Sequence, residues 1–155
     1  YTANFPIRNL AHKDSGPQGR IIIQGTRARA WIPRIKEAGQ MIVNSSAMQT
    51  EAREHMREGD GTVFVTDLGG CQTMPHCRMA SRIEIPAGAS IGYHVHERET
   101  ELYAILEGRG VVTERDGDHP VGPGDAVFTA HGEGHSIKNV GDKPLVMLAV
   151  ITTEA

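Results

Sequence analysis

Residues 62–153 consist of short β-type runs separated by turns that contain glycine. Several runs alternate apolar and polar residues, and the turns include the sequences PAG, DGD, GPGD and VGDKP. The runs are TVFVTDL, RMASRIEI, ELYAILEG, RGVVTER, DAVFTA and PLVMLAVITT. No helical segment interrupts them, which excludes an alternating strand–helix fold. The pattern predicts an all-β domain, either an antiparallel sandwich or a barrel.

Length and charge exclude several classes of protein. A chain of 155 residues suits one domain, and its net charge of -3 provides no basic stripe for nucleic acid. No apolar run approaches the roughly 18 residues that a membrane span requires. The N-terminal residues also lack the order of a secretory signal. We therefore expect a cytoplasmic protein that contacts neither nucleic acid nor membrane.

The chain divides into two parts. Residues 1–43 are rich in Gly, Pro, Arg and Lys, and they contain one short apolar run, RIIIQG, that suits a strand. We interpret them as an arm that either pairs with a neighbouring subunit or is partly mobile. Residues 44–155 form the predicted barrel domain.

The barrel domain is expected to begin with a short helix over residues 44–61. Met48, Ala52 and Met56 recur at four-residue spacing, and Gly59 provides a stop signal. We interpret the apolar stripe as packing against the barrel.

Two cysteines are too few for a disulfide framework. The segment CQTMPHC places Met74 and His76 between Cys71 and Cys77, which leaves a soft-metal site as one interpretation. The simpler interpretation is a loop with two reduced thiols.

The segment GYHVHERETELYAILEG places two histidines and a carboxylate at informative spacing. His94 and His96 leave the same face of a strand, about 7 Å apart, and both can reach one ion. The sequence ERET is interpreted as a turn that brings Glu101, at the start of the next strand, to the same interior. Two-residue alternation then points Tyr103 and Ile105 inward as well.

A fourth candidate ligand is His135, at the start of a later strand after the turn sequence GEG. Three imidazoles and one carboxylate suit a divalent transition metal, and they suit neither calcium nor a structural thiolate zinc site. Such a set leaves positions open for water, dioxygen or a chelating substrate.

These residues resemble the cupin superfamily. The first motif comprises Gly88, His94, His96, Glu101 and Gly108 at the family spacing. The second comprises Gly124, Ala130, Gly132, His135 and Asn139, and it departs from the family only at Ala130, where proline is usual.

The resemblance covers about residues 62–152 and implies a cupin barrel, that is, a double-stranded β-helix or jelly roll. It also implies a homodimer in which N-terminal strands cross between subunits. Carried over position by position, His94, His96, Glu101 and His135 would bind one divalent metal per chain, which is Mn, Fe, Ni, Zn, Co or Cu.

Four further residues are candidates for chemistry. Tyr103, on the inner face, is either a donor to bound substrate or a packed aromatic residue. His131 lies four residues before His135 and is a candidate proton carrier. Arg78 and Arg82 are candidates to bind a substrate carboxylate, if either enters the barrel.

Two functions from different classes remain open. The first is a metal-dependent oxygenase, decarboxylase, lyase or isomerase that acts on a small oxygen-rich metabolite, such as a carboxylate, a 2-oxo or hydroxy acid, or a sugar derivative. The second is a non-catalytic cupin that binds a small carboxylate or sugar as a carrier or sensor. A titratable side chain within reach of the open metal positions would favour the enzyme, whereas an apolar lining would favour the binder.

Overall fold

The computed structural model describes residues 21–23, 42–69, 71 and 74–154. These residues contain eleven strands and two short 3-10 helices. The strands are β1 (Ile21–Ile23), β2 (Gln49–Glu54), β3 (Thr62–Asp67), β4 (Cys77–Ile85), β5 (Ser90–Val95), β6 (Glu99–Glu107), β7 (Gly110–Glu114), β8 (Gly117–Val121), β9 (Ala126–Thr129), β10 (Gly134–Asn139) and β11 (Leu145–Thr153). The 3-10 helices are η1 (Ser45–Ala47) and η2 (Met56–Glu58).

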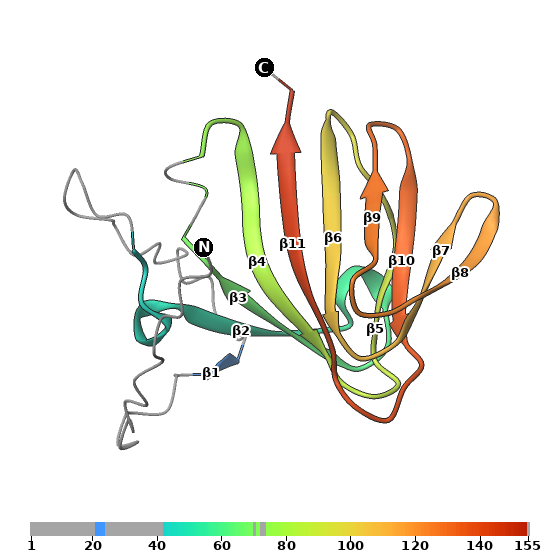
Figure 1. Cartoon of the computed structure of the whole chain (residues 1–155), viewed down its shortest axis with the longest axis horizontal. Helices are drawn as coiled ribbons and strands as arrows, with labels where there is room; N and C mark the ends of the chain where they lie inside the picture. Colours follow the sequence, from blue (N-terminus) through green and yellow to red (C-terminus); the bar gives the residue numbers. More distant parts are fainter. Residues whose placement is uncertain (1–20, 24–41, 70, 72–73, 155) are drawn as a thin grey trace, which may run out of the picture.

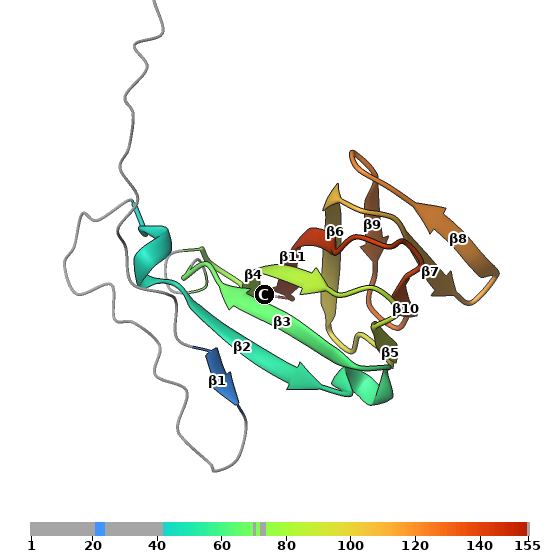
Figure 2. The ribbon, with the colours of Figure 1, turned by 90° about the horizontal axis from the view of Figure 1, so that it is seen from below.

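Two sheets enclose the interior of the barrel. The larger sheet has the order β1-β2-β3-β4-β11-β6-β9, and the smaller has the order β5-β10-β7-β8. Figure 1 shows β4, β11, β6 and β9 side by side, with the β7–β8 hairpin extending to one side. Seen from below in Figure 2, β2 and β3 reach away from the barrel on the opposite side. The fold is therefore the all-β barrel that the sequence predicts.

The core lies between the two sheets and is aliphatic. Residues from both sheets form one cluster, including Ile83 and Ile85 of β4 and Ile91 and Ile137 of β5 and β10, all completely buried. Each such side chain contributes about 1.5–3 kcal/mol relative to an exposed one. This packing fixes how the two sheets face each other across the site.

Strand β6 alternates as its sequence predicts. Glu101, Tyr103 and Ile105 are each 2% exposed, whereas Leu106 is 50% exposed. Since successive side chains of a strand point to opposite faces, Glu101 shares the inner face with the core. The predicted inward placement of these three residues is confirmed.

The predicted helix over residues 44–61 is wrong. Residues Gln49–Glu54 form β2 instead, which pairs antiparallel with β3 from Gln49↔Asp67 to Glu54↔Thr62. The side chains of Glu51 and Arg53, two residues apart, form an ion pair at 2.8 Å, as expected on one face of a strand.

The reason for the error lies in the spacing itself. Met48, Ala52 and Met56 are four residues apart, and four-residue spacing keeps side chains on one side of a helix and also of a strand. Backbone pairing with β3 decides between the two, because the ladder extends along the whole of β2 and pairs the backbone groups on that edge. What remains helical is one 3-10 turn on each side of the strand.

The η2 turn packs against the strand that carries His94. A Cβ atom at Gly92 would overlap the carbonyl group of Arg57, and one at Gly59 would lie 2.3–2.8 Å from the backbone of Ser90 and Gly92. Backbone and side-chain bonds between Asp60 and Ser90, at 2.9 and 2.8 Å, strengthen the contact. Glycine is therefore required at Gly92 by close backbone approach.

Asn139 closes the end of the barrel that lies away from the histidines. Its Nδ2 group donates to the carbonyl groups of Ile85 and Lys143, each at 2.8 Å, and its Oδ1 atom accepts from the Gly141 N–H at 2.8 Å. The side chain is 1% exposed. One amide thus joins the end of β4, the end of β10 and the turn into β11.

Most of the predicted arm over residues 1–43 lies outside the described residues. Strand β1 lies inside the apolar run RIIIQG and pairs in parallel with Thr50–Ala52 of β2. In the described part of the chain, no helix has the length and hydropathy of a membrane-spanning segment.

Candidate metal centre

Four side chains from three strands meet inside the barrel. His94 lies on β5, His96 directly follows β5, Glu101 lies on β6, and His135 lies on β10. His94 and His135 are opposite each other in the β5–β10 ladder, and their ring centroids are 4.8 Å apart. Glu101 reaches them from the other sheet, because the chain crosses between sheets after β5.

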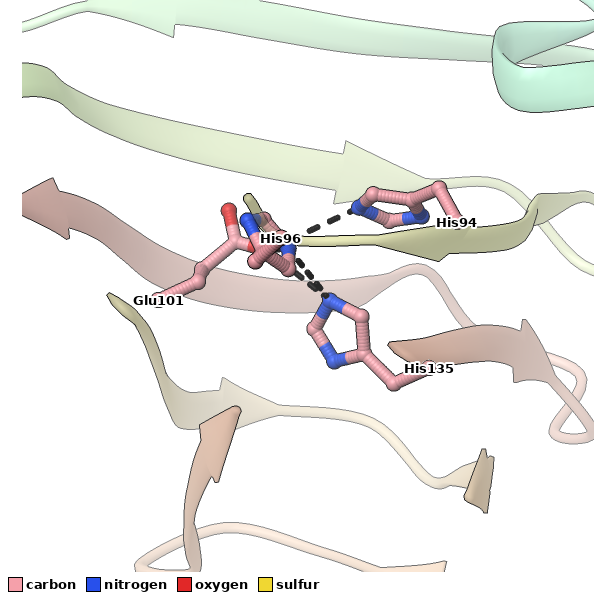
Figure 3. Close-up of side chains that lie close together, drawn as sticks. All are labelled: His94, His96, Glu101 and His135. Carbon is pink, nitrogen blue, oxygen red and sulfur yellow. Dashed lines mark hydrogen bonds and ion pairs between the residues drawn. The ribbon is translucent and has the colours of Figure 1, made fainter. Parts of the chain in front are cut away.

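The Glu101 carboxylate is the centre of this cluster. Its Oε2 atom lies 2.9 Å from His135 Nε2, 3.1 Å from His96 Nε2 and 3.8 Å from His94 Nε2. The four ligand atoms all lie within 4.8 Å of one another. Figure 3 shows the rings of His94 and His135 turned toward His96 and Glu101, with dashed lines for the contacts between them. The cluster could hold a metal ion.

The far nitrogens of His94 and His96 are held by acceptors. His94 Nδ1 lies 2.9 Å from the Gly92 carbonyl oxygen, and His96 Nδ1 lies 2.9 Å from Glu99 Oε1. A carbonyl and a carboxylate only accept hydrogen bonds, so each Nδ1 carries the proton and donates it. Each Nε2 therefore presents a lone pair to the centre when the ring is neutral, which is the tautomer a metal ligand needs.

His135 is held differently. Its Nδ1 atom lies 2.8 Å from the hydroxyl group of Thr129. A hydroxyl group both donates and accepts, so Thr129 suits either tautomer of His135. Without a cation, His135 Nε2–H can donate to Glu101; with a cation, Nδ1–H donates to Thr129 and Nε2 is a ligand.

Because the cluster is buried, any charge on it requires a compensating partner. Burial by itself would raise the pKa of Glu101, but the hydrogen bond with His135 and the nearby imidazoles lower it to about 2. Burial lowers the pKa of His135, although Glu101 opposes the effect. The centre thus contains an ionised carboxylate that is 2% exposed, and a buried charge requires a compensating partner.

The donor set fits a divalent transition metal. Three imidazole nitrogens and one carboxylate oxygen suit Mn, Fe, Co, Ni, Cu or Zn, whereas Ca²⁺ prefers an all-oxygen site. Lone pairs of His94 and His96 that face an anionic oxygen repel it unless a cation lies between them. These features show that the residues fit a metal ion.

Glu99 connects the cluster to the rim of the barrel. It accepts from Arg78 through two bonds, Nε to Oε2 at 2.6 Å and Nη2 to Oε1 at 2.8 Å, while Oε1 also accepts from His96. Burial would raise the pKa of Glu99, but Arg78 and His96 together lower it. Arg78, 46% exposed, thus orients the carboxylate that orients His96.

The loop between β9 and β10 binds the backbone of His96. The His96 N–H donates to the Glu133 carbonyl at 2.9 Å, and the Gly132 N–H donates to the His96 carbonyl at 2.8 Å. Both backbone groups of one ligand are therefore fixed by the loop that leads into His135.

The two predicted substrate-binding arginines lie outside the cluster. Arg78 binds Glu99, the partner of His96, and Arg82 pairs with Glu84 at 3.2 Å on the face of β4 opposite the buried Ile83. The substrate-binding roles of Arg78 and Arg82 stay predictions.

Tyr103 and His131 differ in their access to the centre. The Tyr103 ring stacks on the His135 ring, with centroids 4.8 Å apart. Burial and the Glu101 carboxylate hold the pKa of Tyr103 well above 10, so it keeps its proton. His131 is exposed, and its Nδ1 atom accepts from the Arg98 N–H at 2.7 Å. Their catalytic roles stay predictions.

Sequence reasoning missed Gly92, Glu99 and Thr129, the partners of the three Nδ1 atoms. One signal was present for Glu99, because it lies two residues before Glu101 and shares its face of β6. The sequence places Glu99 inside the predicted turn ERET, whereas β6 already begins there and the turn is confined to Glu97 and Arg98. No local pattern identifies Thr129 or the carbonyl of Gly92.

Comparison with known proteins identifies the family. The family model described as the cupin domain matches residues 81–151, which include all four cluster residues. An oxalate-binding protein of Thermotoga maritima is 42% identical over 118 residues, covering 76% of this chain and 98% of the relative. This chain is a cupin.

Two solved structures also resemble this cupin. The crystal structure of a predicted oxalate decarboxylase from Thermotoga maritima is 40% identical, with a TM-score of 0.69, and covers 74% of this chain and 100% of that one. A putative sugar phosphate isomerase from Acidithiobacillus ferrooxidans is 30% identical, with a TM-score of 0.54 and 60% coverage of each chain.

Proposed function

We propose that this cupin binds one divalent transition metal through His94, His96, Glu101 and His135, and that it binds a small dicarboxylate of the oxalate class at this metal. The observation that carries the proposal is the convergence of three Nε2 atoms on one buried carboxylate, with each Nδ1 held by a partner. A bound ion would supply positive charge to attract and chelate two oxygens of the ligand.

Charge and exposure support an anionic ligand. A divalent cation and one carboxylate leave a net positive charge, since the imidazoles are neutral as ligands. His94 is the most exposed of the four, with 10% of its side chain accessible against 1–2% for the others. We therefore infer that the ligand approaches on the side of His94.

A cavity lies next to the centre, although none of the four proposed ligand residues lines it. It has a volume of about 530 Å³ and is lined in part by Thr129, Gly134, Tyr93 and Phe128. Thr129 is the residue that holds His135, so the cavity borders the centre on that side. The relative named as an oxalate-binding protein supports oxalate as the first ligand to test.

Binding is favoured over turnover by the state of the nearby titratable groups. Among the described residues, Glu99 is bound by Arg78 and His96, His131 accepts from Arg98, and Tyr103 is buried against His135. Turnover needs a group free to exchange a proton with the ligand. The metal-dependent enzyme is therefore the alternative function, and a product assay distinguishes it.

The assembly and location remain proposals too. We infer a cytoplasmic homodimer, with residues 1–43 as an arm that contacts the second subunit. Light scattering on the whole chain and on a chain that lacks residues 1–43 would test this. A monomer in both cases would contradict it.

The function is tested with defined metals and anions. Chelator-treated protein is loaded in turn with Mn²⁺, Fe²⁺, Co²⁺, Ni²⁺, Cu²⁺ and Zn²⁺, and calorimetry then measures oxalate binding. Acetate, with one carboxylate, is the matched ligand, and His135→Ala is the matched variant. We expect binding of oxalate only to loaded wild-type protein, and weak binding of acetate.

Two results would change the conclusion. Equal oxalate binding by metal-free protein or by His135→Ala would contradict a metal-centred site. Release of formate and carbon dioxide from oxalate by the loaded protein would identify an enzyme instead of a binding protein.

A further inference from the structure

Away from the metal cluster, two thiols lie in contact. Cys71 lies between β3 and β4, and Cys77 is the first residue of β4. Their Sγ atoms are 3.8 Å apart, and both residues are half-buried and free of any disulfide. Five residues separate them in the sequence, so bringing the sulfurs together requires the chain to fold back on itself.

The position of Cys77 is fixed at the start of β4, an inner strand of the larger sheet. It is opposite Thr152 of β11, its N–H donates to the Met74 carbonyl at 3.2 Å, and its thiol donates to the Met79 carbonyl at 3.3 Å. The adjacent His76 carbonyl accepts from the Thr153 N–H at 2.7 Å. One member of the pair is therefore held in place while Cys71 lies against it.

No His, Asp or Glu side chain joins the two cysteines as a third ligand among the described residues. There, groups of three or more His, Cys, Asp or Glu ligands occur in the barrel cluster and in Glu114, Asp116 and His119. Two thiolates alone leave a zinc ion two ligands short of its usual four. The soft-metal interpretation of CQTMPHC thus lacks His76 as a ligand beside the two thiols.

We propose that Cys71 and Cys77 are a reversible dithiol–disulfide pair that a small-molecule disulfide oxidises. The thiolate of one cysteine attacks the small disulfide, forms a mixed disulfide and releases one small thiol. The second cysteine then displaces the other small thiol and closes the internal bond. Two protein thiols are oxidised, one small disulfide is reduced to two thiols, and the two protons end on those thiols.

The surroundings of Cys71 set the conditions for this exchange. Burial and the neighbouring Cys77 raise the pKa of Cys71. Since the thiolate is the reactive form, oxidation becomes faster as the pH rises from 7 toward 9.

The bond would tie the β3–β4 connection to the start of β4. It closes a short loop, which removes conformational freedom from the unfolded chain. Its place in the fold is informative, because the next residue, Arg78, binds Glu99. The pair is thus one residue from the rim of the barrel.

The chain offers a direct chemical test. Trypsin cuts after Arg57 and Arg78, and no Lys or Arg lies between them, so both cysteines fall in the single peptide 58–78. Whole protein is reduced, incubated with oxidised glutathione at pH 8, blocked with N-ethylmaleimide, denatured and digested. We expect the peptide to be two hydrogens lighter than its reduced form and free of maleimide. After reduction with dithiothreitol and a second treatment with N-ethylmaleimide, it should carry two maleimide groups.

Thermal unfolding provides the second measurement. The oxidised protein should have a Tm higher than the reduced protein by roughly 5 °C. Cys71→Ser and Cys77→Ser are the matched variants, and each should take up one glutathione, without that increase.

Several outcomes overturn the proposal. They are two maleimide groups on wild-type peptide 58–78, glutathione on both cysteines, or a bond between two chains. Thiols that react only after a chelator is added would indicate a bound metal and would overturn it as well. None of these readouts depends on oxalate binding, so they are independent of the proposed function.

Discussion

In the described part of this cupin, two groups of three or more His, Asp or Glu side chains bring potential ligand atoms within 4.8 Å of one another. The two groups differ in burial and in how their imidazoles are held. The barrel cluster is enclosed, with Glu101 and His135 at 2% and 0% exposure. The second group, Glu114, Asp116 and His119, lies on the β7–β8 hairpin, where the side chains of Asp116 and His119 are 75% and 48% exposed.

The difference shows that closely spaced ligand atoms alone do not make a metal site. In the barrel, acceptors on Gly92 and Glu99 fix the proton of two imidazoles on the far nitrogen. On the hairpin, the His119 Nε2 atom is itself bound to Asp116 at 3.0 Å. Solvent competes for every group there, whereas in the barrel the carboxylate depends on the imidazoles and a cation.

The largest expected effect separates the two groups directly. Glu101→Gln keeps the size of the side chain but removes the only anionic ligand, so stoichiometric metal binding should be lost. The matched change Asp116→Asn should leave it intact. Elemental analysis after dialysis measures both. Loss of metal in Asp116→Asn, with retention in Glu101→Gln, would reverse the assignment of the site.

Glu99→Gln tests whether the partner of His96 matters. Removing a partner that orients a metal ligand typically costs about 10–100-fold in metal affinity. Glu97, exposed and two residues away, provides the matched control as Glu97→Gln. Competition with a chromogenic chelator gives the affinities. Equal affinities for the two variants would mean that Glu99 plays no part in holding His96.

Acidification should distinguish the barrel cluster from the hairpin group, because the imidazoles of His135 and His119 become protonated at different pH values. Burial lowers the pKa of His135, so its lone pair remains available below about pH 6.5. Asp116 raises the pKa of His119, which is protonated at a higher pH. Protons compete with the metal for the imidazole nitrogens. The barrel should therefore still hold its ion just below pH 6.5 and release it only when the pH falls further.

Dialysis of metal-loaded protein over a series of pH values checks this order. His119→Ala should have the same release curve as the wild-type protein, because the hairpin does not contribute. A release midpoint above pH 7 would be inconsistent with a buried site.

The smallest expected effect concerns Thr129. Thr129→Val keeps the shape of the side chain and removes the hydroxyl that His135 needs for Nδ1–H, so metal affinity should fall several-fold. Thr129→Ser keeps the hydroxyl and should restore affinity. Chelator competition measures the difference. An unchanged Thr129→Val protein would show that His135 needs no partner at Nδ1.

The ligands of the barrel cluster can be predicted from the sequence, because strand alternation and motif spacing depend only on nearby residues. His94, Glu101 and Tyr103 lie on the faces that two-residue alternation predicts. The sheet to which each belongs is not local information. Alternation brings Glu101 to the same interior as the histidines, but it does not show that β6 pairs with β11 and β9 while β5 pairs with β10.

The segment before the barrel shows the opposite case. Four-residue spacing from Met48 to Met56 does not distinguish a helix from a strand, and only the ladder with β3 resolves it. Thr129 is only six residues from His135, but no pattern in the intervening sequence shows that the turn brings its hydroxyl group to Nδ1. Such contacts depend on how the chain turns in three dimensions, which the pattern of residue types does not specify.

Because of Asn139, the two ends of the barrel should differ in how well their turns tolerate insertions. Its three bonds require Ile85, Gly141 and Lys143 to stay within reach of one amide. Insertions in the turns at that end would break the set, so we expect length variation there to be poorly tolerated. In the β7–β8 hairpin, the side-chain hydrogen bonds of Thr113 with Asp118 and of His119 with Asp116 stay within the hairpin. Its turn is therefore the place where an affinity tag or a new loop could be inserted without moving the metal ligands.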